Sequence, residues 1–428
     1  MTYKETLDYL YSQLPMYSRI GAPAYKPDLT NTIKLCAAIG NPYEKFRSIH
    51  IAGTNGKGST SHMLAAILQT AGYKTGLYTS PHLKDFRERI RINGEMIPEQ
   101  TVGDFVEHNK NEFEKIQPSF FEMTVALAFD YFAKEKVDIA VIETGLGGRL
   151  DSTNVITPVL SIITNISFDH KDMLGDTLEK IAGEKAGIIK KNIPVVIGES
   201  HPETKMVFLD KAKEMNAPIF FADENYKIKE SKPVGDKLHV TIFKGLQPFL
   251  YDLVLDLPGL YQEKNICTVL QAVEELRKLH ISISKQTIRK AVKKVKTLTG
   301  LRGRWDVLSQ HPLIIADVGH NEGGFKEIFE QLRRQKFTHL HFVIGFVKEK
   351  NLDEILPLFP KDASYYLCCP DIPRGLDVNS LKEKTDRFFL KSSTFSSVKL
   401  ALEGAKNEAL PDDLIYIGGS TFVVAEAL

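Results

Sequence analysis

The chain has 428 residues, and its 55 Lys and Arg against 54 Asp and Glu give a formal net charge of +1. Hydrophobic residues make up 43% and charged residues 25%, a balance that excludes collagenous, disordered and disulfide-scaffold proteins. No apolar run reaches the roughly 18–20 residues that span a bilayer, and the near-zero charge gives no overall attraction to nucleic acid or to an anionic membrane.

The cysteines and the first residues indicate the expected compartment. The four cysteines show no CxxC spacing, which predicts reduced thiols. Residues 1–8 include acidic side chains where a signal peptide needs an apolar stretch. We therefore expect a cytoplasmic protein, with two or three domains at about 100–200 residues each.

Short apolar runs alternate with helical patterns along most of the chain. Ile49–Ala52 is predicted to be a strand that leads into a glycine-rich turn and a helix from near Ser59. Val137–Ile142 and Val159–Ile163 are continuous β-branched runs typical of buried strands. Strands that alternate with helices predict a mostly parallel sheet covered on both faces.

The pattern changes after about Tyr226. Apolar and polar residues alternate as far as Leu257, which predicts an antiparallel excursion, and a helix is expected over Asn265–Leu279. Thr297–Arg304 has two glycines and little periodicity, which is typical of a linker. The expected domains are therefore residues 1–297 and 298–428. Four further strands predict that the second is a smaller α/β domain: Leu313–Ala316, His339–Ile344, Tyr365–Leu367 and Leu414–Ile417.

A glycine-rich loop, GTNGKGST, follows the first predicted strand at residues 53–60. Its glycines are Gly53, Gly56 and Gly58. They let the backbone curl so that N–H groups converge on phosphate oxygens, to which the start of a helix adds its dipole. Lys57 can reach terminal phosphates, and Ser59 or Thr60 offers a hydroxyl to Mg²⁺. The spacing departs from G-x-x-x-x-G-K-[ST], so a plain turn with a solvated lysine is the alternative to the predicted ATP site.

Polar side chains follow the next two predicted strands. Glu143 ends the run at Ile142, where open parallel sheets bind their ligands, and can hold the Mg²⁺ of a nucleotide. A solvent-facing glutamate is the alternative. Asp169 and His170 follow the next strand in the same way, although a lone histidine is more often structural.

Lys185 lies in a predicted helix that Asp176 can cap. The apolar face of this helix comprises Leu178, Ile181, Ala182, Ile188 and Ile189, and Lys185 falls on the same face. Desolvation lowers the pKa of a lysine and makes its neutral amine available. Such an amine could act as a nucleophile or take up CO₂ to form a metal-binding carbamate. The alternative is a side chain that reaches solvent from the helix edge.

A basic loop lies at residues 78–94. Its cations are Lys84, Arg87, Arg89 and Arg91. Guanidinium groups suit carboxylates and phosphates, whereas a solvated charged face would look similar. Asp85 and Glu88 interrupt the positive field, which disfavours an extended nucleic-acid surface.

Eight short motifs occur in order along the chain. They are AGTNGKGS (52–59), SPHL (80–83), RERI (87–90), ETGLGGRLD (143–151), DH (169–170), EKAG (184–187), GR (303–304) and DVGHN (317–321). In these motifs, from about residue 17 to the C-terminus, the chain resembles the folylpolyglutamate synthases, several of which are bifunctional dihydrofolate synthases, in the Mur ligase superfamily. Val318-Gly319 is a mild departure, because the family often has Ala before the histidine.

The resemblance implies a fold and an activity. The fold would be α/β: a P-loop, Mur ligase-like ATPase domain with a mostly parallel sheet, and a smaller Rossmann-like C-terminal domain. The enzyme would be an ATP-dependent carboxylate–amine ligase that adds L-glutamate to a folate, and in bifunctional members to dihydropteroate, through an acyl phosphate. Expected ligands are ATP, Mg²⁺ at two sites, L-glutamate, dihydropteroate and reduced folates. No nucleic acid or membrane partner is expected, and monomers are usual in the family.

The resemblance also implies residue roles. Lys57, His170 and Lys185 would be catalytic. Metal ligands would be Ser80 and Glu143 at one site, with His170 and a carbamylated Lys185 at the other. ATP would be bound by Gly53, Thr54, Asn55, Gly56, Lys57, Gly58, Ser59, Thr60, Asn265, Arg304 and Asp317. The substrates would be bound by Ser80, Pro81, His82, Arg87, Arg89, Phe121, Glu122, Arg149, Asp151 and His320. Since Arg304 and Asp317 follow the predicted linker, domain closure over ATP is expected.

Two alternatives remain at this point. Mur-type ligases that act on a cell-wall nucleotide precursor place a domain of roughly a hundred residues before the phosphate loop, whereas 52 residues precede Gly53 here. A nucleotide-binding module without ligase chemistry would explain the loop and Glu143. It would not explain the basic loop or a lysine on an apolar helix face.

Overall fold

The computed structural model describes residues 1–15 and 28–428, so residue 17, where the resemblance begins, lies outside the described residues. The chain forms two compact units. Unit 1 comprises Met1–Asp256 and Tyr261–Leu301, and unit 2 comprises Leu257–Leu260 and Arg302–Leu428. The chain thus passes between the units three times. Part of the segment expected to be a linker is helical, because α13 covers Val295–Thr299.

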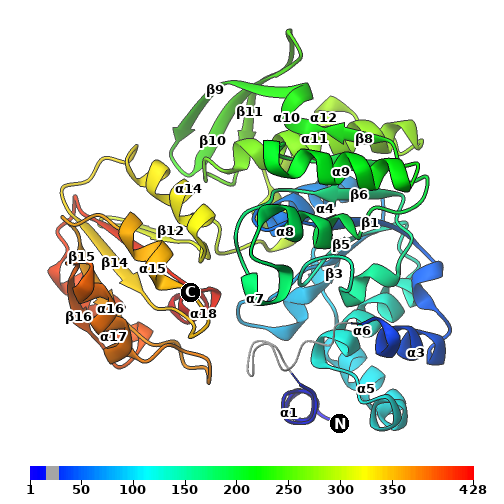
Figure 1. The fold of residues 1–428 in the computed structure, drawn as a ribbon, viewed down its shortest axis with the longest axis horizontal. Helices are drawn as coiled ribbons and strands as arrows, with labels where there is room; N and C mark the ends of the chain where they lie inside the picture. Colours follow the sequence, from blue (N-terminus) through cyan, green and yellow to red (C-terminus); the bar gives the residue numbers. More distant parts are fainter. Residues whose placement is uncertain (16–27) are drawn as a thin grey trace. The chain divides into compact units, whose positions relative to one another are not determined.

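Unit 1 is built on an eight-stranded sheet in the order β4-β3-β2-β5-β1-β6-β7-β8 (Figure 1). The strands are β1 (Arg47–Ala52), β2 (Thr75–Tyr78), β3 (Ile90–Ile92), β4 (Glu95–Met96), β5 (Ile139–Glu143), β6 (Leu160–Ile163), β7 (Val195–Ile197) and β8 (Ile219–Phe221). All neighbours from β2 to β8 are parallel, and β3 and β4 add an antiparallel edge. The predicted mostly parallel sheet is confirmed, with strand ends shifted by one or two residues.

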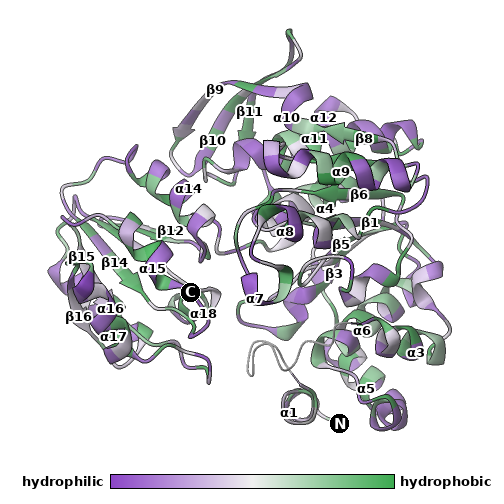
Figure 2. Ribbon diagram, viewed as in Figure 1, coloured by the Kyte–Doolittle hydropathy of each residue, from purple (hydrophilic) through white to green (hydrophobic). Residues whose placement is uncertain are grey.

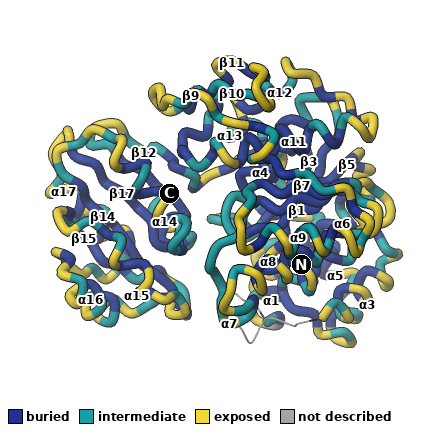
Figure 3. Tube along the Cα trace, turned by 45° about the horizontal axis from the view of Figure 1, so that its top comes forward, coloured by how far each residue is buried: buried dark blue, intermediate teal, exposed yellow. Residues whose placement is uncertain are grey.

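Helices pack on both faces of this sheet (Figures 1 and 3). The helices of unit 1 are α1 (Tyr3–Gln13), α3 (Thr30–Ala38), α4 (Lys57–Thr70), α5 (Glu99–Ile116), α6 (Phe120–Lys134), α7 (Lys171–Leu174), α8 (Leu178–Ala186), α9 (Pro202–Glu214), α10 (Ala222–Asn225), α11 (Gln262–Lys278), α12 (Lys285–Val292) and α13. Short 3-10 turns lie at η2 (Pro42–Glu44), η3 (Phe86–Arg89) and η4 (Ser152–Val155).

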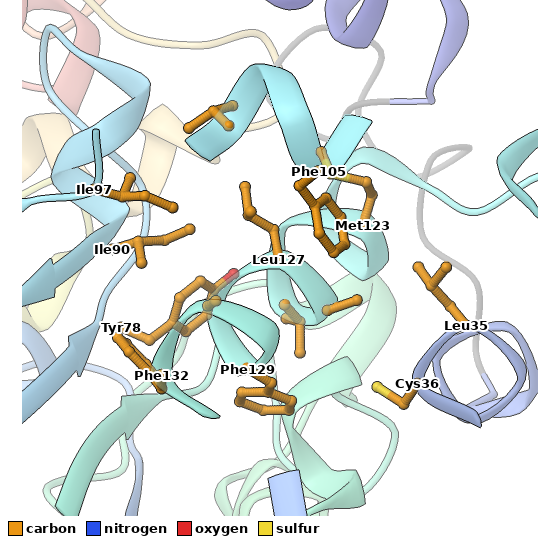
Figure 4. Close-up of a cluster of buried hydrophobic side chains, with 14 of the residues drawn as sticks. Leu35, Cys36, Tyr78, Ile90, Ile97, Phe105, Met123, Leu127, Phe129 and Phe132 are labelled. Atoms are coloured by element: carbon orange, nitrogen blue, oxygen red, sulfur yellow. The ribbon is translucent and has the colours of Figure 1, made fainter. Parts of the chain in front are cut away.

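One part of the core of unit 1 forms around α6. Its Met123, Leu127, Phe129 and Phe132 side chains meet Tyr78 of β2 and residues of α3 and α5 (Figure 4). All four are fully buried. This packing fixes the start of α6, where two of the expected substrate residues lie, against the sheet.

A three-stranded antiparallel sheet consists of β9 (Tyr226–Val234), β10 (Lys237–Lys244) and β11 (Gln247–Leu255). Leu238, Val240 and Ile242 are buried, whereas the residues between them in β10 are partly exposed. The sheet packs on α11 and α12. The predicted antiparallel excursion is therefore confirmed.

Unit 2 is the smaller α/β unit that the sequence predicts. Its six-stranded sheet has the order β12-β13-β17-β14-β15-β16, with only β12 antiparallel to its neighbour. The strands are β12 (Asp306–Gln310), β13 (Leu313–Ala316), β14 (Leu340–Ile344), β15 (Ser364–Leu367), β16 (Lys391–Thr394) and β17 (Leu414–Gly418). The helices are α14 (Glu322–Leu332), α15 (Leu352–Ile355), η5 (Leu356–Leu358), α16 (Val378–Arg387), α17 (Val398–Glu408) and α18 (Thr421–Ala427).

Hydropathy follows burial in both units. The central strands of the two large sheets are mainly hydrophobic, and the outer faces of the helices carry most of the polar residues (Figure 2). Within residues 1–15 and 28–428, no helix is long and apolar enough to cross a membrane.

Candidate functional site

The glycine-rich loop connects β1 to α4. Helix α4 begins at Lys57, two residues earlier than predicted, and Gly56 precedes it with φ +87°. Gly53 has φ +148°. A Cβ atom at Gly53 would overlap the Thr164 side chain, and one at Gly56 would overlap the Asn265 side chain. Backbone conformation and close packing therefore both require glycine here.

Residues that follow β6 hold this loop. Thr54 N donates to Asn165 O (2.8 Å), and Thr54 Oγ1 donates to Ser167 O (3.1 Å). The Thr164 hydroxyl donates to Asn55 O (2.7 Å). These three supports were not predicted from the sequence. Their position after a parallel strand, as for Asp169 and His170, is the signal that could have found them.

Two lysines converge on the first glycine of the loop. Lys57 Nζ donates to Gly53 O (2.9 Å) and Thr54 O (3.1 Å), and Lys185 Nζ donates to Gly53 O (2.9 Å). Only 3% of the Lys185 surface is exposed. Burial, and secondly the nearby Lys57, lowers the pKa of Lys185 to about 7. The apolar-face prediction is confirmed, and the solvent-reaching alternative is wrong.

The predicted cap of the lysine-bearing helix is wrong by one residue. The Thr177 hydroxyl, not Asp176, accepts the backbone N–H of Lys180. Asp176 instead pairs with the ammonium of Lys180 at 2.7 Å. Both side chains are common helix caps, so the sequence alone does not separate them.

Glu143 is the last residue of β5 and is 4% exposed. The turn after it is organised by Asp151. One oxygen of the Asp151 carboxylate accepts Gly145 N (2.9 Å) and Leu146 N (2.8 Å), and the other accepts the backbone and hydroxyl of Thr153. Burial raises the pKa of Asp151. Because four donors of the chain surround this carboxylate, its observed role is to shape the 145–151 turn.

The 145–151 turn lies directly on α8. Arg149 N donates to Glu184 O (2.7 Å), and the Arg149 guanidinium pairs with the Glu184 carboxylate (2.8 Å). A Cβ atom at Gly148 would lie 2.9 Å from the carbonyl oxygens of Glu184 and Lys185. One at Gly187 would overlap Arg149. The glycines in both motifs thus bring Arg149 close to the helix that carries Lys185.

His170 occupies the position before α7 with φ +51°. Its backbone N–H donates to Asp169 Oδ1 (2.9 Å), and its ring Nε2 lies 3.9 Å from the same oxygen. An acidic group therefore faces the imidazole at the expected second metal site.

The two central arginines of the basic loop have different interaction partners. Arg87 pairs with Asp85 (2.6 Å) and Glu99 (3.3 Å), and its guanidinium lies over the ring of Tyr3 in α1. Arg89 is 5% exposed and donates through Nε to His82 Nδ1 (2.7 Å). No carboxylate in the described part of the chain forms an ion pair with Arg89.

The ring of Phe120 lies beneath the Arg89 guanidinium, with 5.4 Å between the guanidinium carbon and the ring centroid. Burial, followed by the charge of Arg89, lowers the pKa of His82 to about 3. The imidazole is therefore neutral and accepts the Arg89 hydrogen bond. Ser80 is half-buried and Pro81 is exposed at the start of this loop.

Phe121 and Glu122 lie at the start of α6. The Glu122 carboxylate accepts Ser119 N (2.6 Å) and the Asn31 side chain (3.5 Å) through one oxygen. Its other oxygen is buried without a hydrogen-bond partner among the described residues. Phe121 packs against Gly145 and lies 6.2 Å from the Tyr78 ring, between centroids. The start of α6 and the 145–151 turn are therefore in contact.

Helix α11 meets the glycine-rich loop through two amides. Asn265 lies against Gly56 and donates to Gln262 Oε1 (2.8 Å). Gln262 in turn donates to Ser59 Oγ (3.1 Å). Gln262 was not predicted from the sequence. Its spacing of three residues from Asn265, on the same face of a helix, was the available signal.

Unit 2 brings Arg304, Asp317 and His320 together near the carboxyl end of β13. The Asp317 carboxylate accepts Trp305 N and Gly319 N, both at 2.8 Å. The Arg304 guanidinium donates to Gly303 O (3.2 Å), and His320 Nδ1 lies 3.0 Å from Val318 O. Asp317 therefore fixes the turn that carries Arg304.

The side chains at this site suit a magnesium ion that is held partly by nucleotide phosphates better than a metal ion that is held by protein side chains alone. No group of three or more His, Cys, Asp or Glu side chains among residues 1–15 and 28–428 could hold a metal. Magnesium usually keeps several waters and binds one or two carboxylates with substrate phosphates. The buried Glu143 at the strand edge beside the phosphate loop supplies such a carboxylate.

Comparison with known proteins agrees with this geometry. Residues 51–273 match the Mur ligase middle domain, and residues 303–421 match the Mur ligase, glutamate ligase domain. The dihydrofolate synthase/folylpolyglutamate synthase of Bacillus subtilis is 38% identical over 418 residues, which cover 94% of each chain. The folylpolyglutamate synthase of Lacticaseibacillus casei is 32% identical over 437 residues, 99% of this chain and 97% of that one.

A solved structure shows the same fold along the chain. E. coli FolC in complex with DHPP and ADP has a TM-score of 0.86 and 28% identity, and the match covers 100% of this chain and 97% of that one. The phosphate loop, the two α/β units and these similarities agree. The chain belongs to the Mur ligase family and, within it, to the folylpolyglutamate synthases/dihydrofolate synthases, which are ATP-dependent glutamate ligases.

Proposed function

We propose that the chain forms its amide bond in two steps on a pteridine acceptor, either a reduced folate or dihydropteroate. An oxygen of the acceptor carboxylate attacks the γ-phosphorus of ATP, and ADP leaves. The amine of L-glutamate then attacks the carbonyl carbon of the acyl phosphate. A C–N bond forms, inorganic phosphate leaves, and the amine loses a proton. The observation that carries this proposal is the convergence of Lys57 and Lys185 on the loop at Gly53.

The nucleotide site would be the loop from Gly53 to Thr60. Its backbone N–H groups and the start of α4 suit phosphate oxygens, and Lys57 would move from its present carbonyl partners to the terminal phosphates. Asn265 would contribute from α11. E. coli FolC, which has the same fold, was solved in complex with ADP, and this supports a nucleotide site in the chain.

Two magnesium sites are proposed beside the phosphates. Glu143 and Ser80 would hold one ion, and His170 and a carbamylated Lys185 would serve the other. Bound Mg²⁺ would neutralise the charge of the transferring phosphoryl group. The pKa of about 7 for Lys185 supports carbamylation, because a large neutral fraction of the amine exists at neutral pH. In that reaction the amine nitrogen bonds to the carbon of CO₂ and releases a proton.

The acceptor would lie against the start of α6 and the 145–151 turn. Phe121 offers a ring for the pteridine, and Glu122 has a buried oxygen without a partner among the described residues. His82, Arg89 and Arg149 would complete this site, with Ser80 and Pro81 at its edge. E. coli FolC binds DHPP, which supports a pterin-containing acceptor.

Arg304 and Asp317 are proposed to bind the nucleotide, and His320 is proposed to bind the substrates. All three lie within residues 303–421, the part that matches the glutamate ligase domain. The role of Arg87 would be to support the basic loop through Asp85, Glu99 and Tyr3. Asp151 would support the acceptor site through the turn that it shapes.

The proposed enzyme acts as a monomer in the cytoplasm. All four cysteines are free, and Cys36, Cys267 and Cys368 are buried, which fits a reducing compartment. Its partners would be small molecules, without nucleic acid or membrane.

The test is Mg·ATP-dependent release of ADP with L-glutamate and either dihydropteroate or tetrahydrofolate as acceptor. We expect turnover with both, as in a bifunctional enzyme. Turnover with one acceptor would restrict the proposal to that acceptor. Failure with both, in protein that binds ADP, would overturn the acceptor assignment and leave the nucleotide site.

A further inference from the structure

Gln262 lies in the first turn of α11. It is not among the residues proposed above to bind the nucleotide or the substrates. It is fully buried, and Ser59, its partner in α4, is 1% exposed. Its side-chain nitrogen lies 3.1 Å from Ser59 Oγ. Hence one buried amide connects α11 to a hydroxyl of the phosphate loop.

The direction of this hydrogen bond is set by a second amide. Asn265 Nδ2 donates to Gln262 Oε1 at 2.8 Å. Since the carbonyl oxygen of Gln262 is used by Asn265, its NH₂ group faces Ser59 and must donate. The Ser59 oxygen is therefore an acceptor in this bond, and the Ser59 proton is not used in it.

The Ser59 proton has no acceptor within the part of the chain that the structure describes. A buried donor without a partner is unfavourable by about 1–3 kcal/mol, so an acceptor on a bound ligand would stabilise this proton. Ser59 lies two residues after Lys57, in the first turn of α4, where backbone N–H groups favour an anion. A phosphate oxygen, which can only accept, suits this proton.

We propose that Gln262 is a positioning residue of the phosphate loop, which holds the Ser59 hydroxyl as a donor to a phosphate oxygen of the nucleotide. This inference rests on the proposed nucleotide site. If the Gln262 side chain were reversed, Ser59 would donate to it and would present only a lone pair, which repels phosphate. Gln262 thus acts through Ser59 and does not itself touch the nucleotide.

The test is the affinity for Mg·ADP, measured by titration calorimetry on the full chain. Gln262→Met keeps the length of the side chain and removes its hydrogen bonds. We expect this variant to weaken ADP binding about tenfold, because the Ser59 hydroxyl would no longer be aligned to donate its hydrogen bond to the charged phosphate. The KM for ATP should rise similarly, whereas the KM for L-glutamate should not change.

Two further variants separate positioning from packing. In a Ser59→Ala background, Gln262→Met should weaken ADP binding less than twofold further, because the hydroxyl through which it acts is gone.

Gln271→Met is the matched control. Gln271 lies in the same helix, is buried, and bonds to Glu275 and Asn225 instead of the loop. It should leave ADP affinity unchanged.

The outcomes are distinct. A tenfold loss that persists in the Ser59→Ala background would overturn the inference and assign Gln262 a packing role. Unchanged affinity in Gln262→Met would also overturn it, provided that the wild type binds ADP. No ADP binding by the wild type would instead overturn the proposed nucleotide site. Should Gln262→Met not fold, Gln262→Leu takes its place: it removes the same hydrogen bonds without adding a charge, so a similar loss is expected, which Ser59→Ala should again abolish.

Discussion

Lys57 and Lys185 donate to the same atom, the carbonyl oxygen of Gly53, at 2.9 Å each. One lysine begins α4 and the other lies in the last turn of α8. Burial of Lys185, together with the charge of Lys57, lowers the pKa of Lys185 to about 7. The folded chain therefore releases this proton near neutral pH.

The first prediction concerns stability and pH. The unfolded chain retains the Lys185 proton up to its ordinary pKa of 10.5. Between that value and about 7 the unfolded state binds more protons, so the contribution of Lys185 to stability rises with pH. The unfolding free energy of wild type minus that of Lys185→Met should increase from pH 7 to pH 9, by at most about 1.4 kcal/mol per pH unit. Urea denaturation at each pH measures it.

The exposed Lys293 provides the control for this series. Lys293→Met should show a difference from wild type that does not change with pH. A flat difference for Lys185→Met as well would mean that Lys185 keeps its proton in the folded state.

The second prediction tests the carbamate. Lys185→Ala should lose ligase activity, and formate, acetate or propionate should restore part of it by placing a carboxylate in the vacated space. Lys57→Ala should lose activity that these anions do not restore. Full activity of untreated Lys185→Ala, measured as ADP release, would remove the carbamate from the mechanism.

The third prediction compares two glycines of the EKAG region. Gly187→Ala places a methyl group against Arg149, so it should destabilise the fold by about 1–3 kcal/mol and lower activity by moving Arg149 away from α8. Gly183 lies within α8, which ends just before Gly187, and an added Cβ there meets no atom within 4 Å. Gly183→Ala should stabilise the fold by about 0.5–1 kcal/mol. Thermal unfolding distinguishes them, and equal effects would contradict the packing seen at Gly187.

The fourth prediction separates Arg87 from Arg89. Arg87→Ala removes ion pairs to Asp85 and Glu99 and should lower the melting temperature with little change in the acceptor KM. Arg89→Ala removes a buried guanidinium that has no carboxylate partner among the described residues. It should raise the acceptor KM about tenfold, as expected for one lost hydrogen bond to a charged group, and leave the KM for ATP unchanged. The reverse pattern would exchange their roles.

The fifth prediction concerns the 145–151 turn. The two carboxylate oxygens of Asp151 accept four hydrogen bonds. In Asp151→Asn an NH₂ group replaces one of these oxygens, so at least one backbone N–H then faces another donor. We expect a loss of about 1–3 kcal/mol in unfolding free energy and a higher acceptor KM. Asp176→Asn is an exposed control and should change neither. An acceptor KM that rises with unchanged stability would indicate direct contact between Asp151 and the acceptor instead.

Local patterns predicted much of the fold, because many of its strands appear in the sequence as short apolar runs or as alternating apolar and polar residues. The run Ile49–Ala52 forms the end of β1, and the alternation around Leu238 and Ile242 forms β10. Spacing also placed Lys185 on an apolar helix face, although it left open whether the side chain is buried or reaches solvent. These features depend on residues within a few positions of one another.

The supports of the site depend on contacts between distant parts of the chain. Asn165 holds the phosphate loop from 110 positions away, and Gln262 reaches Ser59 across 203 positions. No periodicity within one element reports such pairs. Arg87 and Arg89 are likewise equivalent by spacing, and only the presence of Asp85 and Glu99 on one side separates them.

The four residues Leu257–Leu260 determine how this chain can be dissected. They belong to unit 2, although unit 1 sequence flanks them on both sides. The buried Gln331 side chain donates to Pro258 O (2.9 Å) and accepts Leu260 N (2.8 Å). A fragment that starts at Arg302 would lose both partners and leave a buried amide unsatisfied. Proteolytic or genetic separation at the 301/302 junction should therefore yield a destabilised C-terminal fragment.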